Sequence, residues 1–250
     1  MPVYLRLAVG LVLLLAIAVG VSYLGGLGRQ RDLALAALRA VVQLAVVAAA
    51  LRGVFAVPAT SILVVAVMFS VATWTATRRL GPIRGAGRAV VLSCASGASV
   101  TIAIVVALPT LDRNVRTFVA VSGIVLGGTM TAATLAGRHL NEGLRRRRDE
   151  IEAWLSIGAT PRQAVRDVAR RSASEALVPG LDQTRTVGLV TLPGAFIGAL
   201  LGGASAAGAA RFQIVVLVGL MCAQTITVVL LMYLLGAPIT LPIIEAERRR

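Results

Sequence analysis

The chain has 250 residues, of which 57% are hydrophobic and only 14% charged, and its mean hydropathy is +0.85. A water-soluble domain of this size could not bury so much apolar surface, so the composition excludes that class and predicts an all-α integral membrane protein. The formal net charge of +14 would fit a nucleic-acid-binding protein, but basic residues also gather on the cytoplasmic side of membrane proteins, and we expect no nucleic-acid partner.

Apolar windows of about 20 residues, long enough to cross a hydrocarbon core of roughly 30 Å, predict the transmembrane helices. We expect about seven of them within a single transmembrane domain at residues 1–250. In chain order the predicted spans are 7–28, 33–51, 54–77, 89–111, 117–137, 186–210 and 212–235. Pro238 and Pro242 mark where the last helix is expected to have ended, because proline cannot continue a helix interior.

The arginines are divided unevenly between the two sides of these predicted spans. All 25 basic residues are arginine; nineteen lie in connections on one side, five lie on the other side, and Arg39 lies within a span. Because positively charged connections stay in the cytoplasm, we expect the N-terminus outside, and the connection 138–185 and the C-terminus inside. The predicted location is the cytoplasmic (inner) membrane. The nineteen include Arg84 and Arg248 to Arg250, and the five include Arg52 and Arg113.

The long connection at 138–185 predicts two amphipathic helices on the cytoplasmic face. In the first, Ile151, Trp154 and Leu155 follow helical spacing, and Gly158 can end the helix. The three apolar residues therefore form a predicted ridge that could contact another surface.

A second helix is predicted to begin at Thr160, with proline at the first helical position and Gln163 completing a capping box. Its apolar side would carry Val165, Val168, Ala169, Ala173 and Ala176, and its polar side Arg162, Arg166, Asp167, Arg170 and Arg171. One interpretation is a pair of helices lying on anionic membrane lipid. The connection also holds seven acidic residues, which lipid attraction alone would not favour, so a docking element for a cytoplasmic protein is the preferred interpretation.

Chemistry that the chain lacks narrows the function. A phosphate-binding loop of the Walker type needs a lysine, and the sequence contains none, so ATP hydrolysis would require a separate polypeptide. All eleven acidic residues fall in predicted connections or at helix ends, which leaves no base within the bilayer for intramembrane hydrolysis and no carboxylate for ion-coupled transport. We therefore expect that the chain is not itself an enzyme and binds no cofactor of its own.

The polar residues Arg39 and Gln43 lie four residues apart in the second predicted span, and so on one helix face. An arginine near the middle of a membrane costs several kcal/mol unless it pairs, reaches the interface or faces water, so the pair is a candidate part of a substrate pathway. The alternative is that Arg39 extends its side chain to the inner interface, about seven residues away.

Small residues predict close helix packing in the span 186–210. Gly194, Gly198 and Gly202 recur every four residues, a spacing that lets two helix backbones approach. Pro193 precedes them and would kink the helix, which could supply a hinge.

Three stretches carry a resemblance to a known family. They are Leu38-Arg39-Ala40-Val41-Val42-Gln43-Leu44, Arg148-Asp149-Glu150-Ile151-Glu152 followed by Leu155-Ser156-Ile157-Gly158-Ala159-Thr160, and Val187-Gly188-Leu189-Val190-Thr191-Leu192-Pro193-Gly194, together with Gln213. With these residues the chain resembles, over most of its length, the FetB family of ABC-transporter permeases, which includes bacterial iron exporters and plant relatives connected with aluminium tolerance.

The stretch Glu152-Ala153-Trp154, with Gly158 four residues after Trp154, is also similar to the EAA-plus-Gly signature by which many ABC permeases couple to their ATPases. It departs from that signature at Trp154, where a second alanine is usual, and at Arg170-Arg171, where Leu-Pro is expected. The resemblance implies that Glu152, Trp154, Leu155 and Gly158 carry the contact with the ATPase.

The resemblance further implies the permease subunit of an ATP-driven exporter, working as two copies with two copies of a separate subunit that binds ATP and magnesium. Iron or another metal is the implied cargo, with its ligands unknown. Hard cations prefer carboxylate oxygens, which the predicted spans lack, so an anionic or sugar-containing solute stays open. A membrane scaffold that recruits a partner without moving any solute is a further alternative.

Overall fold

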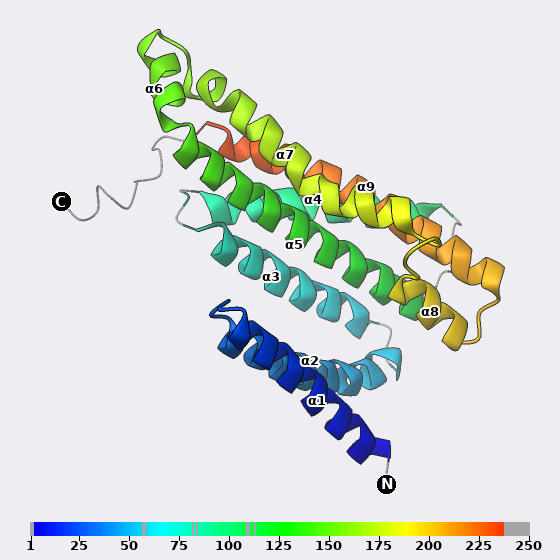
Figure 1. Cartoon of the computed structure of the whole chain (residues 1–250). Helices are drawn as coiled ribbons and strands as arrows, with labels where there is room; N and C mark the ends of the chain where they lie inside the picture. The colour runs from blue at the N-terminus through cyan, green and yellow to red at the C-terminus, as the bar shows by residue number, and fades with distance from the viewer. Residues whose placement is uncertain are drawn as a thin grey trace. The chain divides into compact units, whose positions relative to one another are not determined.

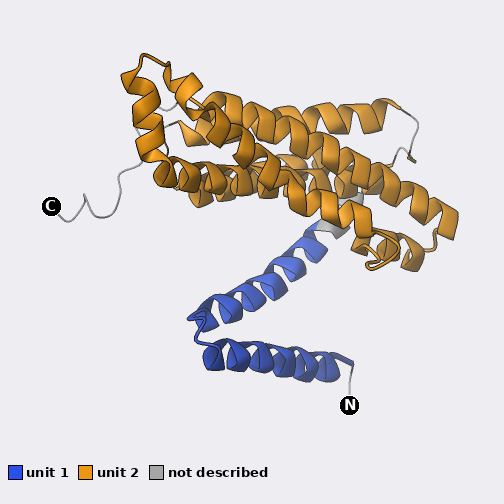
Figure 2. Cartoon of the chain, turned by 45° about the horizontal axis from the view of Figure 1, so that its top comes forward, with its two compact units in different colours: residues 1–59 blue, residues 60–250 orange. Residues whose placement is uncertain are grey.

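The computed structural model describes residues 3–56, 59–81, 83, 85–108, 111–112 and 114–237, with the backbone alone for residues 51–56. Arg84, Arg113, Pro238, Pro242 and Arg248 to Arg250, and the side chain of Arg52, lie outside this description. The described residues form nine helices, and the extended pairing among them is limited to an isolated bridge between Val187 and Thr191. The predicted all-α class is confirmed. The chain divides into two compact units, residues 1–59 and 60–250 (Figure 2).

The first unit contains α1 (Val3–Leu24) and α2 (Gln30–Ala56), which pack against each other. Both are long and apolar, and Ser22 is the one residue with a buried side chain among those described in the two helices. Exposed apolar side chains all around a helix are stable where the surroundings are lipid or another membrane-embedded surface.

In the second unit, five long helices lie side by side (Figure 1): α3 (Thr60–Leu80), α4 (Ala86–Ala107), α5 (Val115–Arg146), α7 (Pro161–Thr186) and α9 (Ala206–Leu235). Two short helices, α6 (Arg148–Ser156) and α8 (Gly194–Leu201), complete it. The core is made of small and branched apolar side chains from α3, α4, α5, α7 and α9.

Glycine lets these helices approach closely at defined points. A Cβ at Gly97 on α4 would lie 2.5 Å from the backbone carbonyl oxygen of Ala223 on α9, and a Cβ at Gly137 on α5 would collide with the side chain of Leu80 on α3. The hydroxyl of Thr227 on α9 donates a hydrogen bond to the carbonyl oxygen of Ser93 on α4 at 3.3 Å. Small residues and interhelical hydrogen bonds are the usual means of packing helices in a membrane.

Six helices of the described chain are long and apolar enough to cross a membrane, namely α1, α2 (over Gln30–Ala50), α3, α4, α5 and α9. They overlap six of the seven predicted spans, so an α-helical membrane protein is confirmed, while the count of seven stays a prediction.

The predicted span at 186–210 is wrong as a continuous helix. Residues 187–193 form a compact turn, α8 has only eight residues, and α9 begins after its N-cap Ser205. Gly188 and Gly203 have φ values of +80° and +92°, which interrupt a right-handed helix. Pro193 also lies before α8 as its N-cap, so it does not kink a longer helix.

Helix α7, which was not predicted as a span, packs against α9 within the bundle. Arg162 at its start contacts Tyr233 near the end of α9, and Gly180 further along packs against the side chain of Gln224, so the two helices run antiparallel. On its other side, Val168 of α7 packs against Gly143 of α5. Residues 161–186, expected in a connection, therefore lie within the bundle of long helices.

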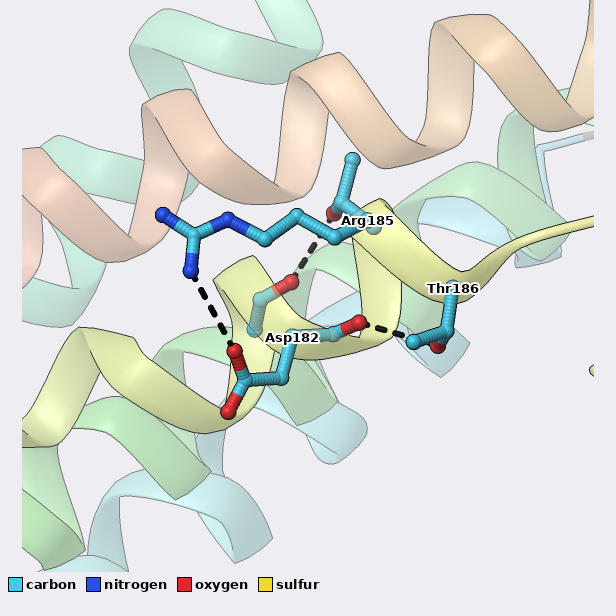
Figure 3. A network of polar contacts seen from close by, with 5 residues as sticks. Asp182, Arg185 and Thr186 are labelled. Atoms are coloured by element: carbon cyan, nitrogen blue, oxygen red, sulfur yellow. Dashed lines mark hydrogen bonds and ion pairs between the residues drawn. The ribbon is translucent and has the colours of Figure 1, made fainter. Parts of the chain in front are cut away.

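Eight charged residues along α7, two of them at its far end, explain why hydropathy does not mark it as a span. Arg185 Nη1 lies 3.5 Å from Asp182 Oδ1, and the Thr186 hydroxyl donates to the Asp182 carbonyl oxygen at 2.9 Å (Figure 3). These are contacts within the last turns of α7, which ends at Thr186.

Candidate functional site

The candidate site is the elbow formed by α6, the following turn and the first turn of α7, residues 147–163. Helix α5 has 32 residues and is about 48 Å long, against roughly 30 Å for a bilayer core. In Figure 1, α6 lies beyond the end of α5, past the ends of the neighbouring helices. The elbow therefore projects from one end of the second unit.

One side of α6 is fixed to the bundle. The side chain of Ile151 is 1% exposed and packs in the same core cluster as Leu140, Leu144, Val165 and Val168. The predicted ridge of Ile151, Trp154 and Leu155 is therefore wrong at its first member, because Ile151 is turned inward and is not available to a partner.

The other side of the elbow exposes apolar side chains at its tip. Trp154 is 49% exposed, Leu155 is 37% exposed and Ile157 is 74% exposed. Ile157 was not among the predicted coupling residues; its only signal in the sequence was an apolar residue directly before the helix-ending glycine. Three apolar side chains thus form the exposed tip of the elbow, and we call Trp154, Leu155 and Ile157 the elbow tip.

The turn after α6 depends on glycine. Gly158 has φ of +90°, its N–H donates to the Leu155 carbonyl oxygen at 3.1 Å, and the Ala159 N–H donates to the Trp154 carbonyl oxygen at 3.0 Å. This is the hydrogen-bond pattern of a Schellman motif, which favours glycine at the left-handed position. The prediction that Gly158 ends the helix is confirmed.

The start of α7 has the predicted capping box. The Gln163 N–H donates to Thr160 Oγ1 at 3.3 Å, and the Thr160 N–H donates to Gln163 Oε1 at 2.8 Å, with Pro161 at the first helical position. The predicted apolar side of this helix packs on α5 and α9: Val165, Val168, Ala169 and Ala176 are buried and Ala173 is partly buried against the core. That side is consequently not available to lipid.

Ion pairs hold the base of the elbow. Arg147 donates to both carboxylate oxygens of Glu150, from Nε at 2.7 Å and from Nη2 at 2.5 Å. These hydrogen bonds lower the pKa of Glu150 and raise that of Arg147, and the nearby Arg171 and Asp167 on α7 act in the same directions. The pairing links the α5–α6 junction to α6, and the charges on α7 reinforce it.

A hollow of about 500 Å³ separates α6 from the first turns of α7. Trp154 and Gly158 border it on one side, and Gln163 and Asp167 border it on the other. A side chain of a partner protein could enter this hollow alongside the elbow tip.

The other two residues predicted for the coupling contact also lie on α6. Glu152 pairs with Arg148 one turn earlier, at 2.7 Å between Oε1 and Nε, and half of its side chain is exposed. Leu155 belongs to the elbow tip. The structure thus brings Glu152, Trp154, Leu155 and Gly158 onto one short projecting element, while their contact with an ATPase stays a prediction.

The remaining predicted residues lie elsewhere. Arg39 and Gln43 are both exposed on α2, in the first unit. Gly194 and Gly198 on α8 face open space within the described chain, and Gly202 caps that helix. The substrate role of the first pair and the packing role of the glycines stay predictions.

The elbow is also linked to the end of α9. The guanidinium of Arg162 lies 4.1 Å from the ring centroid of Tyr233, and its Nη2 donates to the Tyr233 carbonyl oxygen at 3.2 Å. Carbonyl groups in the last turn of a helix lack partners within that helix, and a cation is favourable there. This contact therefore joins the start of α7 to the end of α9.

Comparison with known proteins gives one family. Residues 4–238 match the uncharacterised protein family UPF0014. The chain is 36% identical over 221 residues to the UPF0014 membrane protein STAR2 of Oryza sativa, covering 88% of this chain and 78% of that protein. It is 29% identical over 224 residues to the probable iron export permease protein FetB of Escherichia coli, covering 89% and 86%.

It is also 31% identical over 220 residues to the protein ALUMINUM SENSITIVE 3 of Arabidopsis thaliana, covering 87% of this chain and 81% of that protein. No solved structure matches the chain. The chain belongs to the UPF0014 family of membrane proteins.

Proposed function

We propose that this member of the UPF0014 family is the permease subunit of an ATP-driven ABC exporter, coupled through its elbow to a separate ATPase subunit that binds ATP and magnesium. The observation that carries the proposal is the elbow itself. It has an apolar tip that is exposed to the surroundings, on a base that is fixed by Ile151 and by the Arg147–Glu150 pair. A small, rigid, aromatic projection is the kind of surface that anchors a protein interface.

The cargo we propose is iron or another metal ion or its complex. The support is that a relative with 29% identity over most of both chains carries the name of a probable iron export permease. Two copies of the chain would form the transport path, and closure of the ATPase subunits around ATP would displace both elbows. Through Arg162 and Tyr233 that displacement would reach α9 and change which side of the membrane the path faces.

The orientation we propose has the elbow in the cytoplasm. In a variant whose Cys94 and Cys222 are replaced by serine, we expect Ile157→Cys to react with a membrane-impermeant thiol reagent only from the cytoplasmic side. Asp112 is exposed shortly before the start of α5, at the opposite end of that helix from the elbow, so Asp112→Cys should react only from outside. Labelling of Ile157→Cys in intact cells would contradict the orientation.

The purified chain should not hydrolyse ATP by itself. No lysine is present for a Walker loop, so any turnover in a complex should belong to the partner subunit. The measurement is ATP hydrolysis by the purified chain, compared with the chain purified together with an ATPase subunit. Activity that persists when the Walker lysine of that subunit is replaced would contradict the proposal, and stable binding without any response of turnover to iron would favour a scaffold.

A further inference from the structure

Helix α7 lies at the depth of the membrane-spanning helices. Gly180 packs against the side chain of Gln224 on α9, and Gly128 on α5 packs against the same glutamine. One residue before Gln224, Ala223 contacts Gly97, which is at the middle of α4 (Ala86–Ala107). Because α4 is long enough to span the membrane, Gly180 lies close to the centre of the bilayer.

Charged residues of α7 therefore lie inside the hydrocarbon layer. With a rise of about 1.5 Å per residue, Asp182 is about 3 Å and Glu175 and Arg185 are each about 7.5 Å from the level of Gly180 along the helix. The half-thickness of the hydrocarbon core is about 15 Å, so all three are within it. All three side chains are exposed in this chain.

Such groups do not face lipid, because a charge in the hydrocarbon layer is costly; they face water or another polar surface. The exposed side of α9 is different at the same depths. Val218, about 9 Å from the level of Gln224, is 55% exposed, and Val229, about 7.5 Å from it in the other direction, is 59% exposed. The second unit thus has an apolar face on α9 that suits lipid and a charged face on α7 that does not.

We propose that the exposed face of α7 lines the water-filled path by which a cation crosses the membrane, with Glu175 and Asp182 as the groups that meet the cation. This proposal adds to the proposed function the residues that line the transport path. It rests on the proposed function for the identification of that path as the route of the cargo. Both acids fall within the predicted cytoplasmic connection 138–185, and their position on α7 supplies the carboxylates that the predicted spans lacked.

The order of charges along this face supports a cation. Along the helix, Glu175 and Asp182 lie in the middle of this face. Arg171 precedes them and Arg185 follows them. Asp182 is held by Arg185 at 3.5 Å, with both side chains more than half exposed, so an arriving cation can compete for that carboxylate.

The aqueous path can be tested in membranes that contain this chain without the ATPase subunit. In a variant with Cys94 and Cys222 replaced by serine, a charged methanethiosulfonate reagent should modify Glu175→Cys and Asp182→Cys in membranes. Val218→Cys and Val229→Cys on α9, at similar depths, are the controls and should stay unmodified, since a charged reagent needs water to reach the thiol. Equal and negligible modification at all four positions would overturn the inference.

The cation-facing role is tested in inverted membrane vesicles that contain the chain with its ATPase subunit and are supplied with ferrous iron and ATP from outside. We expect Glu175→Gln and Asp182→Asn each to lose most ATP-driven iron movement, while recovery of the ATPase stays unchanged. Glu142→Gln is the control: this exposed acid on α5 lies 14 residues, or about 21 Å, beyond Gly128 and so outside the core.

The outcomes separate this inference from the proposed function. If the α7 positions are modified but the chain recovers no ATPase, the aqueous face stands and the ATP-driven function fails. If ATP-driven iron movement occurs and neither Glu175→Gln nor Asp182→Asn reduces it, the function stands and the cation-facing role is overturned.

Discussion

Replacing Trp154 with alanine should remove most of the binding between this chain and the proposed ATPase subunit. Trp154 is the largest side chain of the elbow tip and is half exposed on a fixed base, and truncation of such an aromatic anchor commonly costs about 2 kcal/mol or more, roughly thirtyfold in affinity. Ile151 behind it is buried, so the variant should still insert and fold. The measurement is recovery of the ATPase with the purified chain.

Gly158→Val supplies a second, independent test of the same docking site. No atom lies within 4 Å of a Cβ at this position, so the substitution adds no collision and acts only through the backbone, whose φ of +90° is unfavourable for valine. We expect weaker ATPase recovery because the elbow tip is reoriented. Gly158→Asn is the matched control, since asparagine tolerates this conformation better. Undiminished recovery in both Trp154→Ala and Gly158→Val would rule out the elbow as the docking site.

Among these substitutions, Gly97→Ala should lower the stability of the folded chain the most. Its Cβ would overlap the Ala223 carbonyl oxygen and the hydroxyl of Thr227, and moving α9 away would weaken the Thr227–Ser93 hydrogen bond. Overpacking of this kind costs about 1–3 kcal/mol. The measurement is the thermal unfolding midpoint of the purified protein in detergent.

Gly127→Ala is the control for this prediction, because it makes the same change in α5 at a position with no atom within 4 Å. It should leave the midpoint unchanged or raise it slightly, since alanine favours a helix over glycine. Equal midpoints for the Gly97 and Gly127 variants would show that α4 and α9 do not pack as closely as described.

Local signals in the sequence correctly predicted where the first helix of the elbow ends and where the second begins. The capping box at Thr160 and the helix end at Gly158 depend on residues within four positions of each other, and both formed as expected. The direction in which Ile151 points could not be predicted in the same way. Helical spacing alone does not say whether an apolar face meets the rest of the chain or a partner, and here the core around Leu144 and Val165 decides.

The sixth predicted span failed for a different reason. Residues 186–210 are apolar over a sufficient length, but Gly188, Pro193 and Gly203 break the helix, and hydropathy does not register backbone conformation. Helix α7 was missed because its eight charged residues lower its hydropathy, although its small and apolar side packs on α5 and α9. A charged helix can join a membrane bundle when its charges face away from lipid, and only tertiary packing reveals this.

The most direct test of the proposed coupling is ATP-driven iron transport by the chain and its ATPase subunit in inverted membrane vesicles. The proposed function predicts that vesicles with both subunits accumulate ferrous iron when ATP is added. Accumulation should be lost when the Walker lysine of the ATPase is replaced and largely lost with Trp154→Ala in this chain. Iron accumulation that is equal in wild-type and Trp154→Ala vesicles, or that needs no ATP, would contradict the proposed coupling of this chain to an ATPase through the elbow.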